Sequence, residues 1–192
     1  MATWAINVGT DNFSFHDLEV FTEIPLTYSK STNELNGGSP IIHGHQGIDT
    51  LDRTTETFWL SPGNGDSISP FALEYIEYSV NAMINVVGIY PWGGNYEVFI
   101  SVKEGGLWRG LNTIEYTPAG SNPYTGDDTP EINYITKGSV TWETPQFFTL
   151  PRVFSAERIR ITLSNLQRTQ WGPFFYRGGL REVTVGERIP GT

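Results

Sequence analysis

The chain has 192 residues, of which 14% are aromatic and only 17% are charged, and it contains 21 glycines and 12 prolines. This composition favours an all-β protein rich in turns over a helical bundle, in which alanine, leucine, glutamate and lysine would dominate. The formal net charge is −9, and the 12 basic residues are mostly scattered. Nucleic acid is therefore excluded as a partner, because phosphate neutralisation requires clustered lysine and arginine.

Cysteine is absent, which excludes disulfides, cysteine-ligated zinc and thiol catalysis. No run of about 18 apolar residues occurs, so the sequence predicts no membrane insertion. The first residues lack a basic segment followed by an apolar run, and we therefore expect no secretory signal peptide. These features predict a protein that folds in a cytoplasm.

The expected strands in the first half of the chain are short and separated by turn residues. Residues 13–21 alternate weakly between apolar and polar, and residues 58–60 form a short apolar run before the Gly/Pro/Asn turn at 61–66. Residues 72–78 and 82–90 are rich in aromatic and β-branched side chains. Each of these runs has the length and composition of a β-strand.

The second half of the chain continues the same pattern. Residues 96–102 alternate and end in a predicted hairpin turn at 103–106, which leads into a strand at 107–108. Residues 158–163 have a strict period of two. Further strands are expected at 147–150 and 180–185. No segment of a dozen residues keeps a helical period, and many short strands with Gly/Pro turns are typical of a β-sandwich or barrel.

Residues 111–137 interrupt this rhythm with a long polar segment that is rich in turn residues. A loop of this length in a compact domain is usually functional or is ordered by a neighbouring subunit. A plain surface insertion is the alternative interpretation. Without a linker or an internal repeat, we expect one domain over 1–192, with a core at about 10–186 and the inserted loop at about 111–137.

Four signatures resemble the discoidin, or coagulation factor 5/8 type C, domains, and they occur in the order found in that family. They are the entry turn from Asp52 to Trp59, the hairpin at 96–108, the arginine- and isoleucine-bearing strand at 156–161, and the last strand at 180–185. The chain departs from the family at Thr54, where an acid is common, and in its longer loop after the hairpin. The resemblance implies an all-β fold: an antiparallel β-sandwich (jelly roll, galactose-binding-domain-like) with a long inserted loop.

The resemblance also implies a structural calcium at the entry turn. Asp52 and Thr57 would supply oxygens from the turn, Glu182 would reach in from the last strand, and Glu56 is a possible addition. Backbone carbonyls could complete the six to eight oxygens that Ca²⁺ requires. The alternative is a turn held without metal, by hydrogen bonds from its Asp and Thr side chains to the backbone.

Two segments are candidates for contact with a ligand or partner. Residues 90–95 place an aromatic pair on a glycine-rich turn, and residues 171–179 combine aromatic residues with arginine and glycine. Aromatic faces can stack on the C–H faces of a sugar, and they can equally form a protein interface. The candidate residues for glycan or partner contact are Tyr90, Trp92, Asn95, Trp171, Tyr176 and Arg177.

Catalysis is the weaker interpretation, and we expect no enzyme. His43, His45 and Asp49 could share a metal, but their glycine-rich setting is more typical of an exposed loop. Carboxylates also occur as neighbours, at Glu74/Glu77 and Asp127/Asp128, which leaves a glycosidase-type pair open. No nucleophile elbow, phosphate loop or dinucleotide fingerprint is present.

In its aromatic, acidic and glycine-rich composition, its long insertion and its coverage by one domain, the chain resembles the minor tail and decoration proteins of tailed bacteriophages. We therefore expect a non-enzymatic virion structural protein, at the tail tip or as a decoration, assembled in the host cytoplasm. Its sandwich would mediate assembly with other virion proteins and with copies of itself as a homo-oligomer, with a host-surface glycan as a further partner. The alternative is a free-standing carbohydrate-binding module or lectin that binds a saccharide through Trp92 or Trp171.

Overall fold

The computed structural model describes residues 21–31, 50–51, 53, 59–60, 74–110, 112–114, 132–164, 167–168 and 176–188. The strands within these ranges are β1 (Thr22–Ile24), β2 (Thr27–Ser31), β3 (Trp59–Leu60), β4 (Glu74–Trp92), β5 (Glu97–Glu104), β6 (Leu107–Arg109), β7 (Asn112–Ile114), β8 (Ile132–Tyr134), β9 (Thr136–Ser139), β10 (Gln146–Ser164), β11 (Gln167–Arg168), β12 (Tyr176–Arg177) and β13 (Gly179–Glu187). In this part of the chain, no helix is long and apolar enough to cross a membrane.

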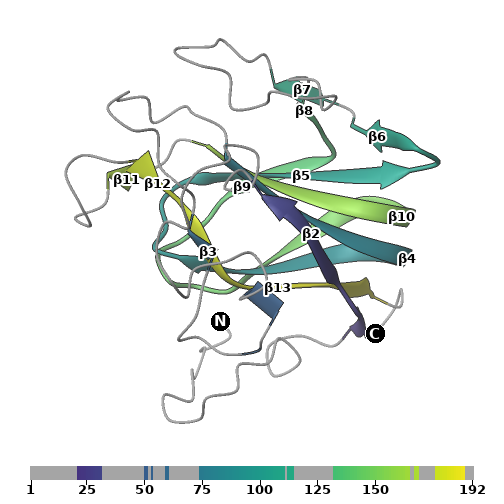
Figure 1. Ribbon diagram of the computed structural model, residues 1–192, viewed down its shortest axis with the longest axis horizontal. Coiled ribbons are helices and arrows are strands. Elements are labelled where there is room, and N and C mark those ends of the chain that lie inside the picture. Colours follow the sequence, from purple (N-terminus) through teal and green to yellow (C-terminus); the bar gives the residue numbers. More distant parts are fainter. Residues whose placement is uncertain are drawn as a thin grey trace.

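Nine of these strands form one antiparallel sheet, and its central path runs β1-β13-β4-β10-β5-β6. Strand β2 pairs with β4, β3 pairs with β13, and β9 pairs with β5. Figure 1 shows β4 and β10 crossing the molecule together, with β5 and β13 on their two sides. Two short ladders, β7–β8 and β11–β12, lie outside this sheet. The architecture is the predicted all-β, antiparallel one.

The two long strands β4 and β10 connect the two layers of the sandwich. The first part of β4 pairs with residues 158–163 of β10, whereas its later residues 86–89 pair with residues 146–149 of β10 and with β13. The pairing of β4 with β10 is irregular between Thr149 and Phe154, and Asn81 has a φ of 54°. Such bulges bend a sheet, and here the bend brings its two halves face to face.

These bends explain one difference from the sequence analysis. The strands expected at 72–78 and 82–90 are one continuous strand, and those expected at 147–150 and 158–163 are another. Pro151 lies within β10, in the part that is not in register with β4. Proline is tolerated at such bulges because no ladder hydrogen bond is required from its nitrogen. Residues that look like strand ends in the sequence therefore mark bends.

The core lies between the two layers. It is built from the alternate residues of each strand that face inward. Ile159, Ile161 and Leu163 are fully buried there, as the period of two predicts. Two tyrosines are buried with their hydroxyl groups satisfied: Tyr96 donates to the Gly179 carbonyl at 2.6 Å, and the Tyr78 hydroxyl lies 2.6 Å from that of Thr50. Burial raises the pKa of Tyr78 and of Tyr96 well above the ordinary value.

The outer face of the β4–β10–β5 layer is also covered, and it carries a buried ion pair. The Arg160 guanidinium lies 2.6 Å from the Glu77 carboxylate, and these side chains are 3% and 0% exposed. The same guanidinium lies 4.3 Å from the ring centroid of Trp108 and 5.0 Å from that of Tyr75. Removing one partner of such a pair costs about 3–5 kcal/mol, because the other charge stays buried. The β6 hairpin therefore contributes directly to the covering of this face.

The ends of the segment predicted as an inserted loop are regular structure. Residues 112–114 pair with residues 132–134, and β9 pairs with β5 inside the main sheet. Ile135 belongs to the hydrophobic core, and Tyr134 packs edge-on against Phe99 at 5.1 Å between ring centroids. The expected boundary near 137 is therefore too late, because residues from 132 onward already pack on the sandwich. Residues 115–131 lie outside the described part.

Candidate functional site

An exposed tryptophan lies on the turn between β9 and β10. The Trp142 side chain is 61% exposed. Thr144 donates from its hydroxyl to the Trp142 carbonyl at 2.8 Å and from its backbone N–H to the Thr141 carbonyl at 3.2 Å. Gln146 accepts from the Thr141 N–H at 2.7 Å and donates to the Ser139 carbonyl at 3.1 Å. The turn is therefore held by the side chains of Thr144 and Gln146, and its most apolar residue faces the solvent.

A second turn, Gly93 to Asn95 between β4 and β5, is joined to the first by backbone hydrogen bonds. The Asn95 N–H donates to the Val140 carbonyl at 2.9 Å, and the Glu143 N–H donates to the Gly93 carbonyl at 2.7 Å. In return, the Gly93 N–H donates to the Glu143 carboxylate at 2.7 Å. The two turns thus form one unit, which we call the Trp142 platform (residues 93–95 and 140–146).

Glycine is required where the two turns touch. A Cβ atom on Gly94 would lie 2.3 Å from the Cα of Trp142, far inside van der Waals contact. A Cβ on Gly93 would lie 3.7 Å from Cζ3 of the Trp142 ring. The ring edge therefore packs near one glycine, and the Trp142 backbone packs directly on the other. This close approach fixes where the Trp142 backbone lies relative to β4 and β5.

An ion pair connects the platform to the opposite layer. Arg181 on β13 donates from Nε to the Glu143 carboxylate at 2.6 Å and from a terminal nitrogen at 3.4 Å. Glu143 itself has a φ of 47°, a left-handed conformation that only a well-supported turn retains. Bidentate arginine–carboxylate pairs add direction as well as energy. Because the two charges compensate each other, the platform has little net charge of its own.

Three of the predicted contact residues lie at or beside this platform. Asn95 is exposed, has a φ of 60°, and belongs to the second turn. Trp92 is half-buried at the end of β4, opposite Gly179 of β13. Tyr90 is only 6% exposed and packs in a small cluster with Phe21, Val86 and Phe147. Of this aromatic pair, Trp92 is therefore partly exposed, whereas Tyr90 lies on a covered face of β4.

The other predicted contact residues cannot be assigned a side-chain environment. Tyr176 and Arg177 form β12, which pairs with β11, and their side chains are not described. Trp171 lies outside the described residues. Ligand contact by these three residues stays a prediction.

Trp142 was not among the contact residues predicted from the sequence. Its neighbours Thr141, Glu143 and Thr144 are polar, and Pro145 follows them. An isolated large apolar residue in a polar turn segment, outside any strand period, has no core face to occupy. That signal was available in the sequence, but the support from Gly94 and Arg181 was not.

The predicted metal ligands are only partly described. Asp52 and Thr57 lie outside the described residues. Glu182 is 4% exposed on β13, and it lines a cavity of about 330 Å³ together with Leu51 and Arg53, the two neighbours of Asp52. Leu51 and Arg53 thus lie near Glu182. Calcium binding itself stays a prediction, and the described residues contain no group of three or more His, Cys, Asp or Glu side chains that could hold a metal.

Trp59 lies where the entry-turn motif predicts it. It begins β3, it is fully buried, and it pairs with Leu180 of β13. Glu182 follows two residues after Leu180 on the same strand, so β13 carries both the strand partner of Trp59 and the predicted ligand Glu182.

The catalytic alternatives receive no support from the described residues. Glu77 is fully buried and paired with Arg160, so its carboxylate cannot reach a substrate from solvent. The side chain of Glu74 is not described, and the candidates at 43–49 and 127–128 lie outside the described part. The burial and pairing of Glu77 thus argue against a glycosidase-type pair at Glu74 and Glu77.

Comparisons with known proteins identify the fold. No family model matches the chain, and no curated protein matches it. Among solved structures, it is similar to CBM32-3 of a family 31 glycoside hydrolase from Clostridium perfringens, with a TM-score of 0.53, 10% identity, and coverage of 85% of this chain and 91% of that one. It is also similar to the family 32 carbohydrate-binding module of EndoD from Streptococcus pneumoniae, with a TM-score of 0.52, 11% identity, and coverage of 87% and 100%.

A third similar structure is reduced XRCC1 bound to the catalytic domain of DNA polymerase β, with a TM-score of 0.51, 14% identity, and coverage of 87% and 99%. At these identities the likeness establishes the fold alone. The chain is an antiparallel, galactose-binding-like β-sandwich with the fold of family 32 carbohydrate-binding modules.

Proposed function

We propose that this chain is a non-catalytic carbohydrate-binding module that holds a saccharide on the Trp142 platform. The observation that carries the proposal is the 61% exposed indole of Trp142 on a turn that is hydrogen-bonded to both layers of the sandwich. Exposed aromatic faces stack on the C–H faces of sugar rings, and nearby polar groups set the orientation. Asn95 and Thr141 are exposed polar residues of the same platform.

The rigidity of the platform supports this function. Binding costs less free energy when the contact surface is already ordered, because fewer side chains and loops lose freedom in the complex. Here Gly94, Glu143 and Arg181 hold the backbone of the turn that carries Trp142 in place before any ligand arrives. The compensated ion pair predicts a preference for uncharged saccharides and an affinity that changes little with salt.

The fold comparison supports a carbohydrate-binding module over the other interpretations. Two of the similar structures are described as carbohydrate-binding modules, and the third is described in a complex with another protein. The virion role, with its assembly partners and self-association, rests on the sequence analysis alone and stays a prediction. No described residue favours it over the carbohydrate-binding function.

A glycan array tests the proposal directly. Wild type should bind at least one neutral saccharide, and Trp142→Ala should lose that binding by about tenfold or more, which corresponds to about 1.4 kcal/mol. Leu107→Ala is the matched control, because Leu107 is equally exposed, at 61%, but lies on β6. A wild-type chain that binds no saccharide on the array would overturn the proposal, as would unchanged binding by Trp142→Ala. The virion hypothesis predicts the first of these outcomes.

A further inference from the structure

A groove lies at the bend of the sandwich, at the other end of β5 from the Trp142 platform. It measures about 570 Å³, and it is formed where the bends of β4 and β10 meet the turn after β5. We call it the bend groove. Its lining residues are Asn81, Ala82, Met83, Glu104, Gly105, Ser155, Ala156 and Glu157. None of them is a lysine or arginine, and two are carboxylates.

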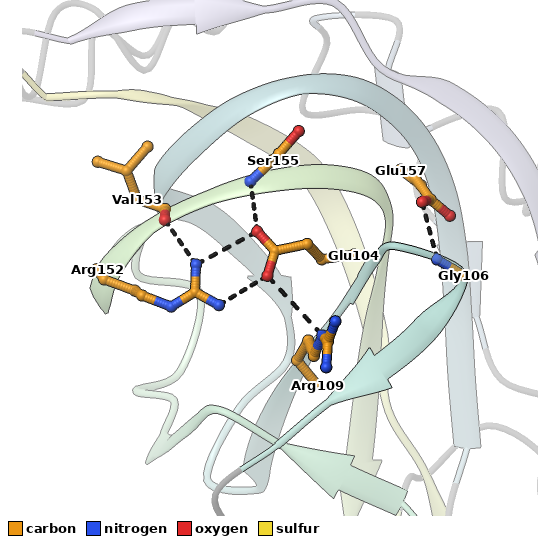
Figure 2. A network of polar contacts seen from close by, with 7 residues as sticks. All are labelled: Glu104, Gly106, Arg109, Arg152, Val153, Ser155 and Glu157. Carbon is orange, nitrogen blue, oxygen red and sulfur yellow. Dashed lines mark hydrogen bonds and ion pairs between the residues drawn. The ribbon is translucent and has the colours of Figure 1, made fainter.

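One wall of the bend groove is rigid because Glu104 joins three segments, as Figure 2 shows. Its carboxylate accepts from Arg152 at 2.7 Å and from the Ser155 backbone N–H at 2.9 Å, and Arg109 lies 3.8 Å away. The hydrogen bonds from Arg152 are the main reason why the pKa of Glu104 falls to about 2. Above its pKa, Glu104 is thus charged and compensated by Arg152, and its part in the groove is structural.

Glu157 differs from Glu104, because its charge is not compensated by any described residue. One carboxylate oxygen accepts from the Gly106 backbone N–H at 2.9 Å. No dashed line reaches the other oxygen in Figure 2, and it has no hydrogen-bond or ion-pair partner among the described residues. The groove therefore contains one fixed carboxylate with an acceptor oxygen available to an incoming cation.

Two further polar side chains of the groove form no hydrogen bond within the described ranges. The Asn81 carboxamide forms no hydrogen bond there, and Asn81 keeps a left-handed φ of 54° at the bend of β4. The Ser155 hydroxyl is likewise without a partner in the described part, since only its backbone N–H is used by Glu104. A non-glycine residue with positive φ costs free energy and is retained where the surrounding structure requires it.

Apolar surface is exposed beside these acceptors. Met83 lies in the groove and is 48% exposed. Leu107, the first residue of β6 after the turn that follows β5, is 61% exposed. These are two of the three large hydrophobic side chains that are exposed among the described residues; the third is Trp142. Methionine is a flexible, polarisable side chain that adapts to apolar ligands.

We propose that the bend groove binds a lysine side chain presented by a partner protein. The aliphatic stem would pack on Met83, and the ammonium group would donate to the free oxygen of Glu157 and to the oxygens of Asn81 and Ser155. An ammonium offers three donors and no acceptor, which matches a site with three acceptor groups. The net charge of −9 favours the approach of a basic partner. A saccharide is the poorer match, because no aromatic residue lines the groove.

Nuclear magnetic resonance of the whole chain tests this proposal with a blocked trilysine peptide as the probe. At low salt, shifts should concentrate on the Met83 methyl group and on the amides of Asn81, Ser155 and Glu157. A blocked triglutamine peptide and glucosamine are the comparison probes. They should cause no such shifts, since the first lacks the charge and the second lacks the aliphatic stem.

Glu157→Gln is the decisive variant, because the glutamine oxygen can still accept from Gly106 while the charge is lost. It should weaken trilysine binding by about fivefold or more. Glu97→Gln, at the far end of β5, removes the same charge and should leave the affinity unchanged. Shifts spread evenly over the acidic surface, equal binding by Glu157→Gln, or equal shifts with glucosamine would each overturn the proposal. Saccharide binding at Trp142 is measured in parallel and is expected to be unaffected, so the two proposals fail separately.

Discussion

The two ends of β5 present different kinds of surface, although both are built by turns that meet across the same strands. At the Trp142 platform the ion pair of Glu143 and Arg181 is compensated, and an indole faces the solvent. At the bend groove a thioether and an uncompensated carboxylate face the solvent together. In both places an arginine–carboxylate pair supports the site rather than forming it. The residues proposed to bind a ligand are instead Trp142 at the platform and Glu157 at the bend groove.

The largest expected effect comes from breaking the platform at its glycine contact. Gly94→Ala would place a methyl group 2.3 Å from the Trp142 Cα, so the two turns must separate. We expect a loss of about 2–3 kcal/mol in the free energy of unfolding and a loss of saccharide binding. Urea denaturation measures the first effect, and calorimetric titration measures the second.

Gly106→Ala at the other end of β5 is the control for this variant. No atom lies within 4 Å of a Cβ on Gly106, and only its φ of 76° opposes the substitution. We expect a cost of about 1 kcal/mol and unchanged saccharide binding. Equal destabilisation by the two variants would contradict the close packing of the turns.

Calcium should raise the stability of the chain through Glu182 on β13. If Asp52, Thr57 and Glu182 hold Ca²⁺, saturating calcium should stabilise the native chain by about 2.7 kcal/mol at a concentration of one hundred times the dissociation constant. The melting temperature should rise for wild type and not for Glu182→Gln, and a chelator should reverse the rise. An equal response of both chains would remove Glu182 from the predicted site.

A smaller effect is expected from the ion pair of the platform. Glu143→Gln keeps an oxygen that can accept from Gly93 but removes the charge that Arg181 contacts. We expect a loss of about 1 kcal/mol in stability and a several-fold weaker saccharide affinity. A double-mutant cycle with Arg181→Gln isolates the pair, and additive effects of the two substitutions would show that the pair contributes nothing.

The smallest effect concerns pH at the bend groove. The pKa of Glu104 is about 2 in the folded chain, below its ordinary value of 4.5, because Arg152 and the Ser155 N–H bind the charged form. Its contribution to stability is therefore complete above about pH 4.5 and is lost as the pH falls through about 2. Unfolding measured between pH 5 and pH 2 should show a steeper decline for wild type than for Glu104→Gln. Parallel declines would contradict this assignment.

Much of the fold could be predicted because its signals are local. The turn at 103–106 contains Gly105 and Gly106 with positive φ, and the adjoining hairpin forms as expected. The strict alternation of residues 158–163 also predicts that Ile159, Ile161 and Leu163 share the core face, although Arg160 and Thr162 on the other face are buried as well. Such features depend on residues that are close together in the chain. Their sequence pattern therefore predicts the local structure.

The candidate sites could be predicted only in part, because they depend on residues far apart in the chain. Trp142 is fixed by Gly94 and by the contact of its neighbour Glu143 with Arg181. The bend groove exists only because β4 and β10 bend at the same place, where the sequence suggests separate strands. Tyr90 shows the reverse case: it lies near the platform in sequence, and the pleat of β4 turns it into a covered face.

Fluorine resonance of fluorotryptophan-labelled protein tests the central claim most directly. Of the six tryptophans in the chain, Trp142 can be identified by the signal that disappears in Trp142→Phe. During titration with the saccharide found on the array, the Trp142 signal should shift and saturate, while those of the buried Trp59 and of Trp108 on β6 stay in place. Saturable saccharide binding with an unchanged Trp142 signal would contradict the account.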